Sequence, residues 1–242
     1  MKEVKIQRAT QRGGANHGWL SAKHSFSFAD YYDTENMNFG ALRVLNDDIV
    51  QGGRGFSMHA HDNMEIITIP LQGALRHKDN MGNEGVVSYG EVQVMSAGTG
   101  VMHSEANANL HDEVKLLQIW LFPREQNVTP RYDQITLDPQ LRINDFQQIL
   151  SPFPEDEGTW IHQDAWFYLG EFNQDKDYDY SIKRSGNGVY IFVIEGMVDC
   201  DGALLNARDA LGISGVEDIT LHIQAESKVL IMDVPMIISN EV

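Results

Sequence analysis

Two short histidine-containing segments carry residue types that bind transition metals. His59 and His61 are separated by one residue in "MHAHDNME", and His103 and Glu105 have the same spacing in "GVMHSEAN". Side chains two positions apart in a β-strand point to the same face. If these two strands face each other across a barrel, three imidazoles and a carboxylate converge. This set suits a divalent Fe, Mn, Co, Ni, Cu or Zn ion, and an octahedral ion would keep two positions for water, substrate or dioxygen.

Glycine-rich turns precede both segments and support their assignment as strands. The sequence "GGRGFSM" leads into His59, and "AGTG" leads into His103. Glycine permits the positive φ angles that tight turns require. A closed structural zinc site fits less well, because such sites usually use cysteine and leave no open position.

Strand patterns dominate the rest of the chain. Apolar runs rich in Val, Ile and aromatic residues recur, among them "MEIITIPLQG", "EVQVMSAG", "VKLLQIWLF", "VYIFVIEGMV" and "KVLIMDVPMII". Clusters of Gly, Asn and Asp separate these runs, which predicts an all-β sandwich or barrel. Residues 138–150 form the one segment with a helical pattern. We place a domain linker at residues 121–134, which contain two prolines.

A weak internal repeat indicates two similar domains. The runs "IITIPLQGAL" and "YIFVIEGMV" lie about half a chain length apart, and each contains a polar residue followed by glycine, Gly73 or Gly196. Each run also leads into an Asp-containing turn. A duplicated β-barrel follows as a hypothesis, whereas the simpler alternative is that unrelated hairpins share this pattern.

Length and charge limit the class of protein and its partners. The 242 residues are enough for two domains with cores of their own. With a net charge of -17 and scattered Lys and Arg, direct nucleic-acid binding is not expected, although a basic protein partner remains open. We find neither a membrane-spanning run nor a signal segment. The single cysteine, Cys200, fits a cytoplasmic location.

The first histidine segment resembles the first motif of the cupin superfamily. That motif combines spaced glycines with H-x-H and a glutamate. Its positions here are Gly53, His59, His61, Glu65 and Gly73. This sequence departs from the motif in having seven rather than six residues between the glutamate and the last glycine.

The second segment resembles the second cupin motif and, more closely, the pirin family. The matching positions are Gly90, Ser96, Gly98, His103 and Asn107, with serine in place of the usual proline and four residues instead of two before the histidine. Pirins carry the similar pattern A-G-x-G-x-x-H-x-E. The stretches "HGWLSAKHSFSFADYYD", "GALRVLNDD" and "VTPRY" are also similar to bacterial pirin-like proteins, so the specific resemblance spans about residues 8–135.

The resemblance implies a bicupin, with two antiparallel β-barrel (jelly-roll) domains and little helix. Residues 1–132 would form an N-terminal metal-binding cupin domain. Residues 133–242 would form a C-terminal cupin-like domain without metal ligands, and "GNGVYIFVIEG" indeed has no H-x-H where the repeat would place one. By position, the resemblance implies His59, His61, His103 and Glu105 as ligands. Glu65 would stand behind them and orient a histidine.

Several bacterial pirin-like proteins are similar to quercetin 2,3-dioxygenases, which implies an oxidoreductase. In that chemistry the 3-hydroxyl of a flavonol is deprotonated, dioxygen adds, the heterocycle opens and carbon monoxide leaves. The cofactor would be one divalent metal per chain, with Fe(II) the first choice, and Glu105 would be both ligand and catalytic base. The expected substrate-binding residues are Phe56, Met58 and Met102, with further candidates Trp19, Phe26 and Phe28.

Two other functions remain open at this point. The chain could be a non-catalytic, iron-binding regulator that acts through a protein partner, as the resemblance to eukaryotic pirins implies. Its substrate could also be a different small enol or phenol. The remaining histidines are expected to be structural, with hydrogen bonding for His17 and His24 and surface or hydrogen-bonded strand positions for His77, His111, His162 and His222.

Overall fold

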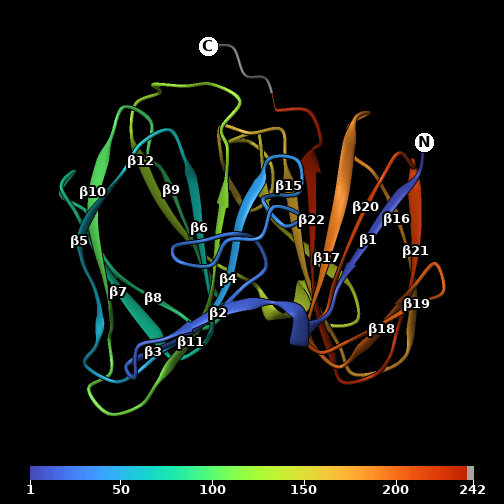
Figure 1. The fold of residues 1–242 in the computed structure, drawn as a ribbon, viewed down its shortest axis with the longest axis horizontal. Helices are drawn as coiled ribbons and strands as arrows, with labels where there is room; N and C mark the ends of the chain where they lie inside the picture. The colour runs from blue at the N-terminus through green and yellow to red at the C-terminus, as the bar shows by residue number, and fades with distance from the viewer. Residues whose placement is uncertain (239–242) are drawn as a thin grey trace.

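The computed structural model describes residues 1–238, and nearly all of its regular structure is β-strand (Figure 1). The helical segments in this range are two short 3-10 helices, η1 (Ala9–Gln11) and η2 (Pro139–Leu141). Within the same range, no helix is long and apolar enough to cross a membrane. The prediction of an all-β chain is confirmed, and the last four residues of the predicted second domain, 239–242, lie outside the described residues.

The first half of the chain forms two facing sheets. The larger has seven strands in the order β12 (Arg131–Thr136), β9 (Glu91–Ser96), β6 (Glu65–Gln72), β11 (Val114–Leu121), β4 (Leu42–Val50), β3 (Leu20–His24) and β2 (Gly13–Asn16). The smaller has four strands in the order β5 (Gly55–His61), β10 (Val101–Asn107), β7 (Ala74–Asp79) and β8 (Glu84–Ser88).

The second half repeats this arrangement. Its larger sheet has the order β1 (Glu3–Gln7), β20 (Ala210–Ser214), β17 (Asn187–Glu195), β22 (Ser227–Pro235), β15 (Trp166–Phe172), β13 (Phe146–Ser151) and β14 (Thr159–Trp160). Its smaller sheet has the order β16 (Lys176–Ser181), β21 (Asp218–Ile223), β18 (Met197–Cys200) and β19 (Ala203–Asn206).

The two halves correspond strand for strand, as the internal repeat in the sequence predicts. In the second half β17 takes the place of β6, and β18 and β19 take the places of β7 and β8. Gly73 and Gly196 follow the two equivalent central strands, and both adopt a positive φ, of 75° and 81°. The described strands form open sheets, so the barrel closure in the prediction is not confirmed.

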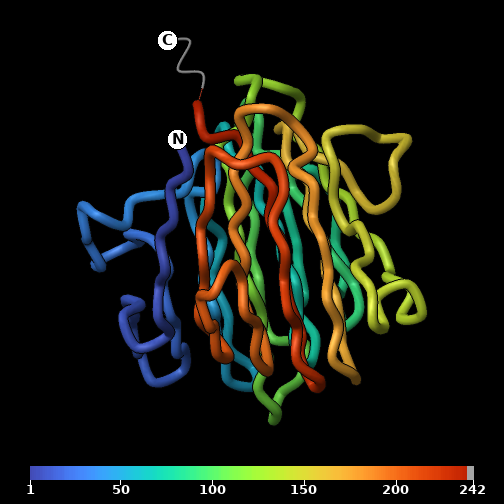
Figure 2. Tube along the Cα trace, turned by 90° about the vertical axis from the view of Figure 1, so that its right-hand side faces the viewer, coloured from blue at the N-terminus to red at the C-terminus, as the bar shows by residue number. Residues whose placement is uncertain are grey.

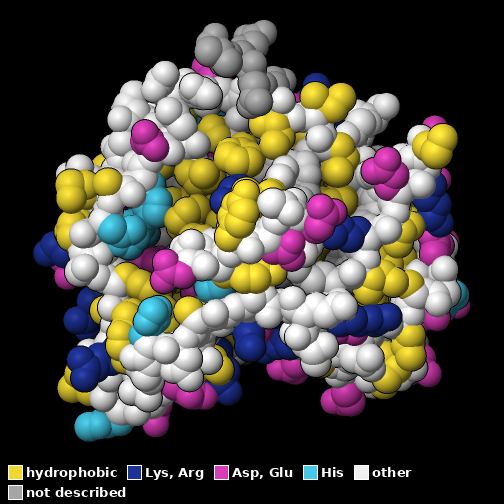
Figure 3. Space-filling model, viewed as in Figure 1, with side chains coloured by type: hydrophobic (Ala, Val, Ile, Leu, Met, Phe, Trp, Pro, Cys, Tyr) yellow, Lys and Arg dark blue, Asp and Glu magenta, His cyan; other side chains and the backbone are white. Residues whose placement is uncertain are grey.

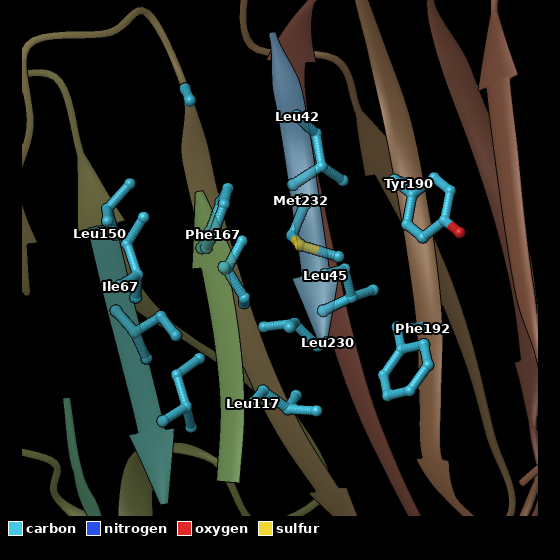
Figure 4. Packing of buried hydrophobic residues seen from close by; sticks show 14 of the residues in the cluster. Leu42, Leu45, Ile67, Leu117, Leu150, Phe167, Tyr190, Phe192, Leu230 and Met232 are labelled. Atoms are coloured by element: carbon cyan, nitrogen blue, oxygen red, sulfur yellow. The ribbon is translucent and has the colours of Figure 1, made fainter. Parts of the chain in front are cut away.

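The two large sheets pack face to face along the middle of the molecule. Their shared core includes Leu45, Ile67 and Leu117 from the first half and Phe167, Phe192 and Leu230 from the second (Figure 4). Alternation along β11 sends Leu117, Ile119 and Leu121 into this core. The intervening Leu116, Gln118 and Trp120 therefore face the interior of the first half, where they line a cavity.

The interiors of the two halves are filled differently. Between the sheets of the second half lies a continuous apolar core that includes Val189, Ile191, Val198, Ile219 and Leu221. The first half has smaller apolar clusters between its sheets, together with buried histidines and carboxylates. Burying such polar groups has a free-energy cost unless they gain partners, so this interior is where function is expected.

Two predicted features of the organisation differ from the structure. Residues 138–150 form the short η2 and most of β13 instead of a longer helix. The predicted division between residues 132 and 133 falls inside β12, which pairs with β9 of the first half along its whole length. In addition, the N-terminal strand β1 crosses to the second half and pairs with β20, as Figure 2 shows from the side.

Candidate metal centre and cavity

The two histidine segments are neighbouring antiparallel strands, β5 and β10, of the small sheet. In their register His103 lies opposite His59, and Val101 lies opposite His61. One ligand atom from each of His59, His61 and His103 can be chosen so that all three lie within 4.8 Å of one another. The imidazoles therefore converge from one face of adjacent strands, whereas the sequence suggested strands facing each other across a barrel. Figure 3 shows histidine side chains gathered on this part of the surface, over β5 and β10.

The protonation states of these imidazoles suit metal binding. Burial, followed by the nearby His59, lowers the pKa of His61 to about 4. Burial and the neighbouring histidines lower the pKa of His103 to about 3. His59 places Nδ1 2.8 Å from the carbonyl oxygen of Ser57, which can only accept, so in the neutral ring Nδ1 carries the proton and Nε2 has the lone pair.

One buried nitrogen supplies a direct test of fit to a metal. His103 Nε2 is fully buried and has no hydrogen-bond partner among residues 1–238. A buried polar atom of this kind is costly unless something else completes it. A divalent metal held by the imidazoles would do so, and these residues therefore fit the group that the ligand types suggest.

Glu105 lies on the same inner face of β10 as His103, and only 3% of it is exposed. Gln118 Nε2 donates to both carboxylate oxygens, at 3.2 Å and 3.0 Å, and Thr68 Oγ1 donates to Gln118 Oε1 at 2.7 Å. Burial raises the pKa of Glu105 above its usual range, although the bond from Gln118 opposes the shift. The structure groups this carboxylate with His77 and His103, with ligand atoms within 4.8 Å of one another.

His77 is the member of this site that sequence reasoning missed. It is fully buried on β7, with Nδ1 3.5 Å from His103 Nδ1 and Nε2 3.1 Å from Asp79 Oδ2. The ring of Tyr132 stacks on it at 4.7 Å between centroids. Asp79, His77 and the candidate ligand His103 are thus linked by successive side-chain contacts. The available signal was "HKD", where His77 and Asp79 have the same alternate spacing as the other pairs.

A cavity of about 430 Å³ opens next to the histidines, between the two sheets of the first half. His59, His61 and Glu105 contribute to its lining. Much of the remaining wall is aromatic, with Trp19 against Phe56 at 5.4 Å and Phe28 against Trp120 at 5.3 Å between ring centroids. A cavity of this size with flat apolar walls suits a small aromatic molecule.

A β-bulge brings Phe56 into the cavity. Opposite β10, the register steps from His103–His59 to Glu105–Phe56, so β5 contains one extra residue at this point. The extra residue reverses the alternation and turns Phe56 to the same face as His59. Gly55 permits close pairing next to the bulge, because a Cβ there would lie 2.2 Å from the carbonyl oxygen of Glu105.

Three further sequence predictions for the pocket are corrected. Met58 is 47% exposed and Met102 is 44% exposed, on the outer face of the small sheet, so they do not take the predicted substrate-binding positions. Phe26 packs in the core between the large sheets. The alternation that sends His59 and His103 inward sends their neighbours Met58 and Met102 outward.

Glu65 also differs from its predicted position behind the histidines. It begins β6 on the face that contributes Ile67 to the core between the halves, and Ser96 Oγ donates to it at 2.7 Å. The turn between β5 and β6 means that alternation along β5 does not extend to Glu65. Burial raises its pKa to about 7. Its contacts therefore belong to the junction of the two halves.

Comparison with known proteins decides the family. The sequence model of pirin matches residues 3–121, and that of the quercetinase C-terminal cupin domain matches residues 148–234. A protein of Escherichia coli (strain K12) named quercetin 2,3-dioxygenase is 41% identical over 232 residues, covering 96% of this chain and 99% of that protein. The chain belongs to the pirin family. This pirin is also 38% identical to a protein of Zymomonas mobilis named as a putative quercetin 2,3-dioxygenase, covering 91% of this chain and 93% of the relative.

Solved structures agree with the fold of this pirin. YhhW from Escherichia coli has a TM-score of 0.92 at 41% identity, covering 96% of this chain and 98% of that one. A second structure, bacterial pirin YhhW in complex with nickel(II), has a TM-score of 0.91 at 40% identity, covering 96% and 99%. The expected resemblance to pirins is confirmed, and the fold is a two-domain cupin fold.

Proposed function

We propose that this pirin is a metal-dependent dioxygenase that opens the heterocyclic ring of flavonols such as quercetin and releases carbon monoxide. The observation that carries the proposal is the convergence of three imidazoles, two of which line an aromatic-walled cavity together with the buried carboxylate of Glu105. The names of the relatives support the same activity, since the Escherichia coli protein is named quercetin 2,3-dioxygenase.

The residues proposed to hold the metal are His59, His61, His103 and Glu105, with Fe(II) the first choice. When bound, a divalent metal supplies Lewis acidity and the dioxygen chemistry that the reaction needs. The buried, unpartnered Nε2 of His103 and the free lone pair on His59 support this ligand set in the described part of the chain. The nickel(II) complex of YhhW supports a divalent ion without identifying the physiological one.

Glu105 is proposed to accept the proton of the flavonol 3-hydroxyl. Its carboxylate lines the cavity, and Gln118 donates to both of its oxygens and so fixes the orientation of the base. The aromatic pairs Trp19–Phe56 and Phe28–Trp120 would hold the flat rings and keep water from the reacting face. One flavonol and one dioxygen together contain all the atoms of the ring-opened ester and the carbon monoxide, so the balance needs no other oxidant.

The test is metal loading followed by turnover. The metal-free protein is loaded separately with Fe(II), Mn(II), Co(II), Ni(II), Cu(II) or Zn(II), and bound metal is measured by elemental analysis. Quercetin absorbance, oxygen uptake and carbon monoxide are then followed together. We expect equal consumption of quercetin and oxygen, with matching release of carbon monoxide. Bound metal without turnover of any flavonol would contradict the proposal and favour the alternative, a non-catalytic iron-binding regulator acting through a protein partner.

A further inference from the structure

The wall of the cavity contributed by the large sheet carries a second group of polar side chains. Asn46 and Asp48 from β4 and His24 from β3 line the cavity together with Glu105. In the strand register Asn46 lies beside His24, and Asp48 lies beside Ala22. The group therefore belongs to the sheet that faces the one carrying the candidate metal ligands.

Asp48 has an unused hydrogen-bonding oxygen at the cavity. The residue is 5% exposed, and its Oδ1 is fully buried without a hydrogen-bond partner in the described range 1–238. Ala22, its neighbour on β3, has a small side chain and lines the cavity together with Asp48. A buried carboxyl oxygen without a partner is destabilising, and a donor on a bound molecule would remove that cost.

His24 adds a second acceptor to the same wall. Its Nδ1 lies 2.8 Å from Asn46 Oδ1, and because the amide oxygen only accepts, Nδ1 carries the proton. The other ring nitrogen, Nε2, then has a lone pair. Burial lowers the pKa of His24, which keeps the ring neutral at neutral pH. Asp48 Oδ1 and His24 Nε2 are therefore two hydrogen-bond acceptors on this wall of the cavity. A hydroxyl group of a bound molecule is a donor that could bind to them.

We propose that Asp48 and His24 form a polar subsite that accepts hydrogen bonds from a phenolic hydroxyl of the substrate other than the reacting 3-hydroxyl. The inference rests on the proposed function and narrows its substrate class to flavonols with hydroxyl groups beyond the 3-hydroxyl. Aromatic side chains share the cavity lining with the histidines and this subsite, and the cavity of about 430 Å³ lies in the range that holds such a molecule.

The experiment compares two flavonols on the metal-loaded full chain. Quercetin carries additional hydroxyls, whereas 3-hydroxyflavone has the same reacting ring without them. The variants are Asp48→Asn and the matched control Asp47→Asn, since Asp47 precedes Asp48 on β4 and pairs with Arg12 on the other side of the sheet. KM and kcat are measured for both flavonols, and anaerobic binding is followed by fluorescence quenching. Circular dichroism and melting temperatures show whether each variant is folded.

We expect the wild type to bind quercetin about tenfold or more tightly than 3-hydroxyflavone, because a hydrogen bond that completes a buried, unpartnered carboxyl oxygen has this effect. Asp48→Asn should raise KM for quercetin by about tenfold and leave KM for 3-hydroxyflavone unchanged. Asp47→Asn should keep the preference. An equal effect of Asp48→Asn on both flavonols, or no effect on either, would overturn the subsite.

The anaerobic binding measurement distinguishes a failure of the proposed subsite from a failure of the proposed ring-opening reaction. If neither flavonol is turned over but the wild type prefers quercetin and Asp48→Asn loses that preference, the subsite stands and the ring-opening proposal fails. If the wild type binds both flavonols equally, the subsite is overturned whatever the turnover. This second result needs no variant, so it does not depend on whether Asp48→Asn folds.

Discussion

Glu105 is the residue whose two proposed roles, ligand and base, can be separated by substitution. Glu105→Gln keeps the size of the side chain and an oxygen that Gln118 can reach, but it removes the negative charge and the basic site. We expect kcat for quercetin to fall by roughly 10²–10⁴-fold even at saturating metal. Turnover and bound metal are measured on the same samples. Wild-type kcat in metal-loaded Glu105→Gln would exclude the base role.

The buried Glu65, at the junction of the two halves, should make the free energy of unfolding depend on pH. Burial raises its pKa from 4.5 to about 7, so the folded chain binds this proton more tightly than the unfolded chain. Its stabilising contribution is fully present below about pH 4.5 and is lost as the pH rises through about 7. Glu65→Gln should remove this loss and raise the free energy of unfolding at pH 8, relative to wild type, by about 1–3 kcal/mol.

The measurement is urea unfolding at pH 5 and pH 8 for wild type, Glu65→Gln and the surface control Glu155→Gln. Other groups with raised pKa values, such as Asp48, titrate in all three proteins and cancel in the comparison. The control should keep the wild-type pH profile, because Glu155 is exposed. Parallel profiles for wild type and Glu65→Gln would show that burial of Glu65 has no such energetic effect.

At the residue scale, the alternation of side chains along a strand predicted correctly which residues of one strand share a face. It did not predict features that depend on the pairing of one strand with another. The spacing of His59 with His61 and of His103 with Glu105 was enough to place each pair on one face. The inward turn of Phe56 depends on a bulge that only the pairing with β10 reveals. Asp48 and His77 come from strands far apart in the sequence, and no local pattern brings them to the site.

At the element scale, β7 supports β10 as its neighbour in the small sheet. His77 on β7 contacts His103 and is itself held by Asp79 and Tyr132. Groups that hold the second nitrogen of a metal-binding imidazole set its orientation, and their loss typically weakens metal binding 10–100-fold. We therefore expect His77→Leu to bind metal about 10–100 times more weakly while it remains folded.

Competition with a chelator measures the metal affinity, and circular dichroism checks the fold. The matched control is His222→Leu, because His222 also hydrogen-bonds an aspartate from a strand but lies exposed in the second half. The control should bind metal like wild type. Equal affinities for His77→Leu and wild type would limit His77 to a packing role.

Local strand patterns predicted most elements, and the failure at residues 138–150 has an identifiable cause. Phe146, Ile149 and Leu150 occur there at the i, i+3, i+4 spacing that also fits a helix. Asn144 adopts a positive φ of 55°, which interrupts a helix, and β13 then pairs with β15. Pairing across the sheet, which a local pattern does not contain, decides this segment.

At the scale of the whole molecule, two features join the halves. The large sheets share one core, and β1 crosses from the N-terminus to pair with β20 in the second half. Arg8, just after β1, also pairs with Asp209 at 2.8 Å. The internal repeat in the sequence predicted two similar units. It did not predict the core that the large sheets share or the pairing of β1 with the second half.

A consequence is that a destabilising substitution in the core of the second half should also affect the candidate metal centre in the first half. Ile219 is 2% exposed in the core of the second half, and Ile219→Ala should lower the free energy of unfolding by about 2–5 kcal/mol. If the halves unfold as one unit, metal release during heating must shift to lower temperature together with the loss of β-structure. Calorimetry and a metal-sensitive dye record the two events in parallel, and Leu204→Ala, at a 45% exposed position of the same half, should shift neither. Metal release at the wild-type temperature in Ile219→Ala, after the second half has melted, would show that the halves unfold independently.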